Sequence, residues 1–281
     1  MFKASLARCG VDYFDYYLLH SLQESHGTSY EDNGCFDFVQ RMRAEGKIRH
    51  IGFSFHGSPA FLEKLLTEHP EMEFVQLQIN YADWDNESIA SRWNYEIARK
   101  HGKRIIIMEL VKGGILANVR PDVWQALDAV DADASAAVIA LRFVASLPGV
   151  EVVLSGMSSP VQLEDNISAF DAFKPLTDDQ MAAMHRAAEV LLGVPTVPCT
   201  NCRYCVEGCP MSIRIPDVFK SWNMLLTFGE HFRSHGMYND LLKAGSGRAG
   251  DCVACGQCES ACPQHISIIE ELRKVSAQLD K

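Results

Sequence analysis

Two cysteine runs with identical spacing constrain this chain of 281 residues more than any other feature. The first run follows the pattern C-x2-C-x2-C-x3-C before a proline, and the second run repeats both the pattern and the proline. Their members are Cys199, Cys202, Cys205 and Cys209, then Cys252, Cys255, Cys258 and Cys262. Each cysteine of the second run lies 53 residues after its counterpart, so this part of the chain is an internal duplication.

This spacing is typical of cubane iron–sulfur clusters, in which four thiolates surround one compact core. Three cysteines on a tight turn can serve one cluster, and in two-cluster ferredoxins the cysteine before the proline serves the other. The sequence therefore predicts two [4Fe–4S] clusters that exchange their fourth ligands. The predicted sets are Cys199, Cys202, Cys205 and Cys262 for one cluster, and Cys252, Cys255, Cys258 and Cys209 for the other.

Zinc and disulfides are the alternatives for these cysteines. Structural zinc takes four ligands, usually as two separated pairs, and two runs of four match that pattern poorly. Disulfides need an oxidising compartment, and nothing in the sequence indicates secretion. Cys9 and Cys35 stand alone and are interpreted as small buried side chains. The 42 residues between the runs carry apolar positions at helical spacing, which favours an α-helical ferredoxin module over residues 193–281.

The net charge and the hydropathy of the chain argue against several classes of function. The chain has 26 basic and 36 acidic side chains, a formal net charge of −10, so a broad nucleic-acid surface is not expected. No stretch approaches the roughly 18 apolar residues of a membrane helix. The first residues meet acidic side chains too early for a signal peptide. The predicted location is the cytoplasm, with no nucleic-acid or membrane partner.

Residues 1–192 alternate short apolar runs with amphipathic segments. Strands are expected over 13–20, 48–55, 74–81, 104–111 and 150–156. Helices are expected over 34–45, 59–68, 87–101, 134–146, 160–169 and 177–192. Apolar strands separated by helices predict an α/β domain whose parallel sheet is covered by helices. The pattern fits either a doubly wound sheet or an eight-stranded barrel.

Four separated segments carry a family resemblance: GVDYFDYYLLHSL, AEGKIRHIGFSFH, VQLQINY and VVLSGMSSPVQLEDNISAF. In this order they resemble the aldo/keto reductase family, and the cysteine-rich tail resembles that of members with a C-terminal two-cluster ferredoxin domain. The resemblance implies an incomplete (β/α)8 TIM barrel of about five βα units over residues 1–192. It also implies a nicotinamide cofactor, NADH or NADPH, and a small carbonyl or alcohol substrate at the carboxyl ends of the strands.

The resemblance begins at the family's fourth strand. The catalytic Asp, Tyr and Lys of the family lie on the first three strands and have no counterpart here. Three explanations fit: a truncated reading frame, a partner chain that supplies the strands, or a shortened fold. His20 matches the catalytic histidine, which orients the substrate carbonyl. Tyr16 shares its face of the strand but is expected to be buried, about 13 Å deeper in the barrel, and so is no substitute proton donor.

The resemblance also implies a set of cofactor-binding residues. Ser54 and Gln76 match positions that contact the nicotinamide amide, whereas Phe55 and Glu109 replace the usual Asn and ring-stacking Tyr. The adenosine end matches Ser155, Gly156, Met157, Ser158, Gln162, Asp165 and Asn166. A helix N-terminus there suits phosphate. The family's basic residues for NADPH are absent from these positions, so neither nicotinamide is preferred.

Two functions from different classes follow. The first is an oxidoreductase that interconverts a carbonyl and an alcohol while two clusters exchange single electrons with a redox partner protein. A nicotinamide moves two electrons as hydride, each cluster moves one, and direct coupling usually needs a flavin, for which the sequence carries no signature. The second is a non-catalytic iron–sulfur electron-transfer protein on a partial reductase scaffold.

Overall fold

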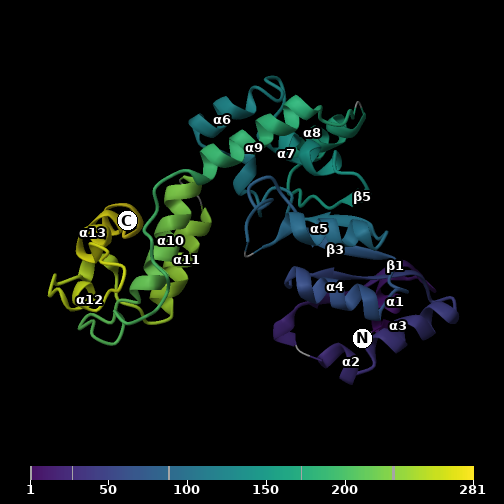
Figure 1. The fold of residues 1–281 in the computed structure, drawn as a ribbon, viewed down its shortest axis with the longest axis horizontal. Helices are drawn as coiled ribbons and strands as arrows, with labels where there is room; N and C mark the ends of the chain where they lie inside the picture. The colour runs from purple at the N-terminus through teal and green to yellow at the C-terminus, as the bar shows by residue number, and fades with distance from the viewer. Residues whose placement is uncertain (1, 27, 88, 172, 230–231) are drawn as a thin grey trace. The chain divides into compact units, whose positions relative to one another are not determined.

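The computed structural model describes residues 2–26, 28–87, 89–171, 173–229 and 232–281, drawn in Figure 1. The chain divides into two compact units. Unit 1 comprises the residues up to 118 and 124–188, and unit 2 comprises 119–123 and 189–281. Within the described ranges, no helix has the length and apolar character that crossing a membrane requires.

Unit 1 is built on one five-stranded sheet. Its strands are β1 (Phe14–Leu22), β2 (Ile48–Phe55), β3 (Phe74–Gln78), β4 (Arg104–Met108) and β5 (Val150–Val153). Each strand is parallel to the next one along the chain, so the order is β1-β2-β3-β4-β5. Right-handed crossovers between successive neighbours place every connecting helix on the same face. A barrel wall has this topology and a doubly wound sheet does not, which decides between the two sheet types that the sequence left open.

The helices of unit 1 follow the strands in alternation. They are α1 (Phe2–Cys9), α2 (Ser29–Asp32), α3 (Cys35–Ala44), α4 (Pro59–Glu68), α5 (Ser91–Lys100), α6 (Pro121–Leu127), α7 (Ala136–Ala145), α8 (Pro160–Asp171) and α9 (Asp178–Leu192). Ser58 and Ser135 begin α4 and α7, and their hydroxyls accept hydrogen bonds from the amides of Phe61 and Val138 at 3.3 and 3.1 Å. These bonds satisfy amides that the first helical turn leaves free.

The core of unit 1 lies between the sheet and its helices. Strand β2 contributes Ile51, Phe53 and Phe55, each at most 2% exposed. Gly52 of the same strand faces Phe74 of β3 so closely that a Cβ would collide with the Phe74 carbonyl and ring. Glycine is therefore required there for the two strands to pair.

Strands β3 and β4 are shorter than the sequence predicts, ending at Gln78 and Met108 instead of 81 and 111. After β3, the Asn80 side chain accepts a hydrogen bond from the Asp83 amide at 2.9 Å and turns the chain away from the sheet. After β4, Glu109 has a left-handed φ of 61°, which ends the strand. The helix expected over 87–101 begins at Ser91, and residue 88 lies outside the described residues.

Three predicted burials are wrong. Tyr16 is 48% exposed, on the edge strand β1 of the sheet. Its ring instead packs beside His50 and Phe74, with ring centroids at 4.9 and 5.5 Å. Cys9 is exposed at the end of α1, and Cys35 at the start of α3 is only partly buried.

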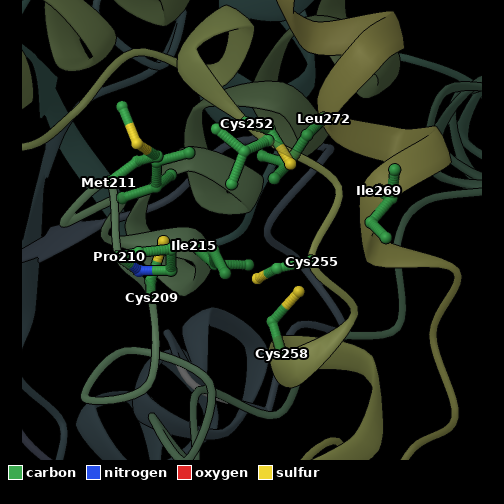
Figure 2. A pocket seen from close by; sticks show the side chains of 11 residues that line it. Cys209, Pro210, Met211, Ile215, Cys252, Cys255, Cys258, Ile269 and Leu272 are labelled. Atoms are coloured by element: carbon green, nitrogen blue, oxygen red, sulfur yellow. The ribbon is translucent and has the colours of Figure 1, made fainter.

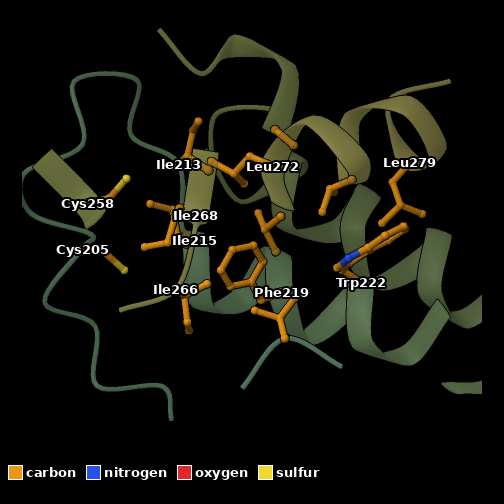
Figure 3. Packing of buried hydrophobic residues seen from close by; sticks show 14 of the residues in the cluster. Cys205, Ile213, Ile215, Phe219, Trp222, Cys258, Ile266, Ile268, Leu272 and Leu279 are labelled. Carbon is orange, nitrogen blue, oxygen red and sulfur yellow. The ribbon is translucent and has the colours of Figure 1, made fainter. Parts of the chain in front are cut away.

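Unit 2 is helical, as the apolar spacing between the cysteine runs predicts. Its helices are α10 (Ile215–Phe228), α11 (Phe232–Lys243), α12 (Gln257–Ser260) and α13 (Ile268–Leu279). Figure 3 shows its core, in which Phe219 and Trp222 of α10 pack with Leu272 and Leu279 of α13. Cys205 and Cys258 belong to the same buried cluster. Helices from both halves of the duplication therefore build one core around the cysteine loops.

Candidate metal centres and cofactor edge

Four thiols line a first cavity in unit 2. Three of them, Cys199, Cys202 and Cys205, come from the first run, and the fourth, Cys262, comes from the second. The remaining wall is largely apolar and consists of Thr200, Ile215, Pro216, Phe219, Gln264, Ile266 and Ile268. The fold thus brings the last cysteine of one run to the first three of the other.

A second cavity repeats this arrangement with the runs exchanged. Cys252, Cys255 and Cys258 line it together with Cys209, and Figure 2 shows these side chains around one space. Its apolar wall includes Pro210, Met211, Ile213, Ile269 and Leu272. Ile215 lines both cavities and so lies between them.

The two cysteine loops share an unusual backbone conformation. Non-glycine residues rarely adopt a positive φ, yet Asn201, Arg203 and Ser212 of the first loop have φ values of 58°, 67° and 53°. The positions 53 residues later, Ala254, Gly256 and His265, have values of 54°, 77° and 51°. Left-handed residues among right-handed ones make neighbouring amides converge, an arrangement that binds anionic groups such as the sulfides and thiolates of an iron–sulfur cluster. Sequence reasoning missed this feature, whose only signal was the shared offset.

The protonation of the cysteines depends on their burial. Burial raises the pKa of the Cys205 and Cys258 thiols to about 11. The pKa of Cys205 is raised further by the nearby charges of Cys199, Cys202 and Cys262. Because metal ligation requires the thiolate, only a cationic group in the cavity would make these buried sulfurs lose their protons at neutral pH.

The donor set matches an iron–sulfur cluster. Each cavity offers four soft thiols and an otherwise apolar wall, the surroundings in which such clusters are bound. Within the described ranges, no three His, Cys, Asp or Glu side chains meet the geometry of a site for a single metal ion. Four thiols that line one cavity without the geometry of a single-ion site fit a core of several atoms better than one ion.

Polar side chains form hydrogen bonds with the chain segment that leads into each cysteine loop. Asn223 of α10 donates to the carbonyl of Val197 and accepts from its amide, both at 2.8 Å, just before the first loop. Before the second loop, the fully buried Tyr238 donates to Asp280 at 2.6 Å and accepts from the Ala249 amide at 2.7 Å. In the first case the bonds join α10, which follows the loop, to the chain that enters it. In the second case Tyr238 of α11 joins the chain that enters the loop to the residue after α13.

At the carboxyl ends of the strands of unit 1, His20 is exposed near the end of β1. His56, which follows β2, lies close enough to interact electrostatically with His20 and with Glu109, which follows β4. Burial lowers the pKa of His56, the charge of His20 lowers it further, and Glu109 opposes the shift. The structure therefore gathers two imidazoles and a carboxylate at the edge where the sequence predicts catalysis.

Ser54 and Gln76 both have partners within the sheet. The hydroxyl of the buried Ser54 accepts a hydrogen bond from the Ser21 amide at 2.7 Å. The Gln76 amide nitrogen lies 3.2 Å from the Met108 sulfur of β4, a weak acceptor. Ser54 consequently stabilises the bend where β1 ends, and the carbonyl oxygen of Gln76 remains as an acceptor for a ligand.

The predicted adenosine-binding residues form one loop and helix after β5. Gln162 accepts hydrogen bonds from the Ser158 and Ser159 amides at 2.7 and 3.2 Å. Asn166 donates to Ser155 at 2.9 Å, and Asp165 accepts from Ser135, which caps the preceding helix α7, at 2.7 Å. Gly156 and Met157 are exposed at the tip of the loop. These polar groups make a defined start of α8, on the opposite sheet edge from His20.

A buried ion pair near the same carboxyl edge was missed by the sequence analysis. Lys112 contacts both carboxylate oxygens of Asp83 at 2.6 and 2.7 Å, and the Asp83 side chain is only 3% exposed. Asn80 donates to the same carboxylate at 2.9 Å and to the Glu109 carbonyl at 3.2 Å. The loops after β3 and β4 are therefore locked together, which sequence spacing did not indicate.

Two family models match this chain. Residues 1–189 match the model of the aldo/keto reductase family, and residues 198–267 match the model of the 4Fe-4S dicluster domain. The protein belongs to the aldo/keto reductase family. It carries a 4Fe-4S dicluster domain in the same chain.

Individual relatives agree with this assignment. Over 190 residues the chain is 32% identical to an aldo-keto reductase of Mycolicibacterium vanbaalenii. The match covers 65% of this chain and 60% of the relative, so the chain spans about 60% of that protein's length.

Solved structures show the same fold. An aldo-keto reductase of Bacillus halodurans in its holo form superposes with a TM-score of 0.53 and 23% identity over 67% of this chain and 66% of that one. A reductase of Brucella melitensis gives 0.52 and 22% over 66% and 64%.

Proposed function

We propose that this protein is an iron–sulfur oxidoreductase whose ferredoxin unit holds two [4Fe–4S] clusters with exchanged fourth ligands. The observation that carries the proposal is the pair of four-cysteine cavities, each lined by three thiols of one run and the last thiol of the other. When bound, such clusters supply one-electron chemistry. The eight thiolates would hold them in the reducing cytoplasm, where cysteines stay free of disulfides.

The surrounding residues would protect and orient the clusters. Ile215 lies between the cavities, so the two clusters would be separated by little more than one aliphatic side chain. The apolar walls exclude water from the buried sulfurs of Cys205 and Cys258. The amides that converge in the left-handed loops would point toward the sulfides and thiolates of the clusters. The short distance between the clusters and their apolar surroundings would favour electron transfer from one cluster to the other.

The reductase unit would supply carbonyl or alcohol chemistry with NADH or NADPH. His20 would donate a hydrogen bond to the substrate oxygen, and Ser54 and Gln76 would face the nicotinamide amide. The loop from Ser155 to Ser158, with Gln162, Asp165 and Asn166, would hold the adenosine end. The support for these roles is family membership, together with the place of His20 and Ser54 near the carboxyl ends of β1 and β2 and of the loop directly after β5.

The metal content tests the ferredoxin part. Anaerobically purified or reconstituted protein should contain about eight iron atoms and eight sulfides per chain, because two cubane clusters account for both numbers. Zinc without sulfide would overturn the proposal, and about four of each would show that one cavity holds no cubane cluster.

A second candidate function is electron transfer without nicotinamide chemistry. His20 on β1 and the loop after β5 lie on opposite edges of the sheet, which favours this candidate. Anaerobic titration with NADH and NADPH, followed by nicotinamide fluorescence, separates the two. Micromolar binding that Met157→Glu weakens would support the reductase, since the new carboxylate repels phosphate. Val11→Glu, at another exposed apolar position, is the control. No binding to a chain with intact clusters would support the electron carrier.

A further inference from the structure

Unit 2 contains a third cavity that neither cluster site nor the nicotinamide edge uses. It has a volume of about 440 Å³, within the usual range of ligand pockets. Residues of the segment before the first cysteine run, of α10 and of the chain leading into α13 form its wall. They are Pro195, Thr196, Val197, Pro198, Trp222, Leu226, Gln264, His265, Ile266, Ser267, Glu270, Glu271 and Lys274.

This cavity adjoins the first cysteine cavity. Gln264 and Ile266 line both spaces, so their side chains are the partition between them. Figure 3 shows Ile266 and Trp222 in one packed cluster with Cys205. A molecule in the third cavity would therefore lie one side-chain layer from a cluster bound by Cys199, Cys202, Cys205 and Cys262.

The chemistry of the wall favours a flat, largely apolar ligand. Trp222, Val197, Leu226 and the two prolines provide an apolar floor, against which an aromatic ring can stack. Thr196, Gln264 and Ser267 provide hydroxyl and amide donors at the rim, suited to carbonyl oxygens on the edge of a ring.

The charge of the wall favours a neutral ligand over a phosphorylated one. The Lys274 ammonium contacts Glu270 at 3.1 Å and Glu271 at 2.7 Å. Trp222 also donates to Glu271 at 3.2 Å, which holds that carboxylate in place. Two carboxylates with one ammonium leave a negative rim, which would repel a phosphate group.

We propose, building on the proposed clusters, that this cavity binds a neutral quinone and passes it electrons from the first cluster. The quinone accepts two electrons and two protons and becomes a hydroquinone. One electron comes from each reduced cluster, which returns from [4Fe–4S]⁺ to [4Fe–4S]²⁺, and the second reaches the quinone through the first cluster. Water at the open rim supplies both protons, and a low-potential one-electron donor reduces the clusters beforehand. A quinone accepts electrons one at a time and completes a two-electron reduction, so it can connect one-electron and two-electron reactions.

The test measures binding and electron transfer separately. Equilibrium dialysis of menadione against the oxidised, cluster-loaded chain should show saturable binding at one site. Thr196→Trp fills the cavity from an exposed position and should weaken binding by at least about tenfold. Thr67→Trp, at an exposed position of α4 in unit 1, should leave it unchanged. Riboflavin 5′-phosphate should bind worse than menadione, and Glu270→Lys should narrow that difference.

The second readout is the reoxidation of dithionite-reduced clusters, followed by their visible absorbance. The rate should saturate with menadione in the unchanged chain and lose that saturation in Thr196→Trp. Intact clusters without saturable menadione binding would overturn the quinone site and leave the clusters untouched. Tighter binding of the flavin phosphate than of menadione would also overturn it. A chain that incorporates no iron or sulfide would instead contradict the proposed function.

Discussion

At the scale of single residues, the left-handed φ values of the cysteine loops cost conformational energy and in return orient the loop amides. Arg203 and Ala254 adopt φ values of 67° and 54°, in a region that costs an L-residue about 1–2 kcal/mol. The equivalent of Arg203 in the second loop is Gly256, which avoids this cost. Both halves of the duplication adopt positive φ values at equivalent positions. We therefore infer that the bound group determines the conformation of both loops.

Gly256→Ala should therefore destabilise unit 2. No atom lies within 4 Å of the added Cβ, so backbone strain of about 1–2 kcal/mol is the expected effect. Gly236→Ala is the matched control, because Gly236 also has open space around it but lies inside helix α11, where alanine stabilises by about 1 kcal/mol. Anaerobic urea unfolding followed by circular dichroism measures both. Equal midpoints for the two variants would contradict the strain argument.

Glu73 is a second residue with a measurable individual effect. Burial raises the pKa of its carboxyl group, but hydrogen bonds from His50 at 2.8 Å and from Arg43 at 3.1 Å outweigh burial, so the pKa falls below its ordinary value. A carboxyl group with a lowered pKa in the folded state stabilises the fold above its unfolded pKa. That contribution disappears as the pH falls through the folded value.

Glu73→Gln should accordingly cost about 1 kcal/mol at pH 7 and progressively less below about pH 4. Hydrogen exchange of the β2 and β3 amides reports this locally, independent of cluster loss in acid. Glu68→Gln is the control, since Glu68 is exposed on α4 and forms only a weak ion pair with Lys64, at 3.8 Å. A Glu73→Gln penalty that stayed constant across this pH range would show that the carboxylate charge is not its cause.

At the scale of elements, one arginine holds the ends of two helices. The Arg120 guanidinium, in the short segment of unit 2 before α6, donates to the carbonyls of Val190 at 3.2 Å and Leu191 at 3.4 Å at the end of α9. It also donates to the carbonyl of Thr227 near the end of α10. A bidentate pair with Asp122 at 2.9 and 3.1 Å orients it. Helix C-termini leave carbonyls free, and a cation there is favourable.

Arg120→Met should destabilise unit 2 by about 2–3 kcal/mol, because carbonyls in a partly buried site lose their donor. Arg120→Lys should recover only part of this, since an ammonium cannot bridge several acceptors as the planar guanidinium does. Arg186→Met, at an exposed position of α9, should change little. The loss of visible cluster absorbance on heating measures all three variants. Full recovery of stability in Arg120→Lys would show that the positive charge of Arg120, and not its planar geometry, is what stabilises unit 2.

At the scale of the whole molecule, the duplication makes two cluster sites depend on each other. Residues 53 apart in sequence face different cavities, whereas Cys205 and Cys262 face the same one. Neither half of the duplication contains four thiols of one site. Both halves must therefore fold together before either site is complete.

Pairs of cysteine substitutions test this exchange. Cys205→Ala with Cys262→Ala removes two ligands of one proposed cluster, so about four iron atoms should remain. Cys205→Ala with Cys209→Ala removes one ligand from each, and both clusters should be weakened. Anaerobic iron and sulfide determination with electron paramagnetic resonance of the reduced protein distinguishes the outcomes. The reverse ranking of the two pairs would show that each run ligates its own cluster.

Much of this arrangement could be predicted before the fold was known. The alternation of apolar runs indicated the five strands and most helices of unit 1, and the insert between the cysteine runs indicated the helices of unit 2. Strand ends were less predictable. Asn80 and Glu109 end β3 and β4 through a side-chain hydrogen bond and a left-handed backbone, which hydropathy does not report.

The cysteine spacing, the duplication and the family motifs are local or ordered along the chain, and so the sequence contains them. The partition between the two thiol cavities by Ile215, the Asp83–Lys112 pair and the cavity beside Trp222 join residues that are far apart in the chain. Their distances depend on how whole helices and strands pack. Packing sums many weak contacts over the entire core, whereas a motif records only the order of its residues.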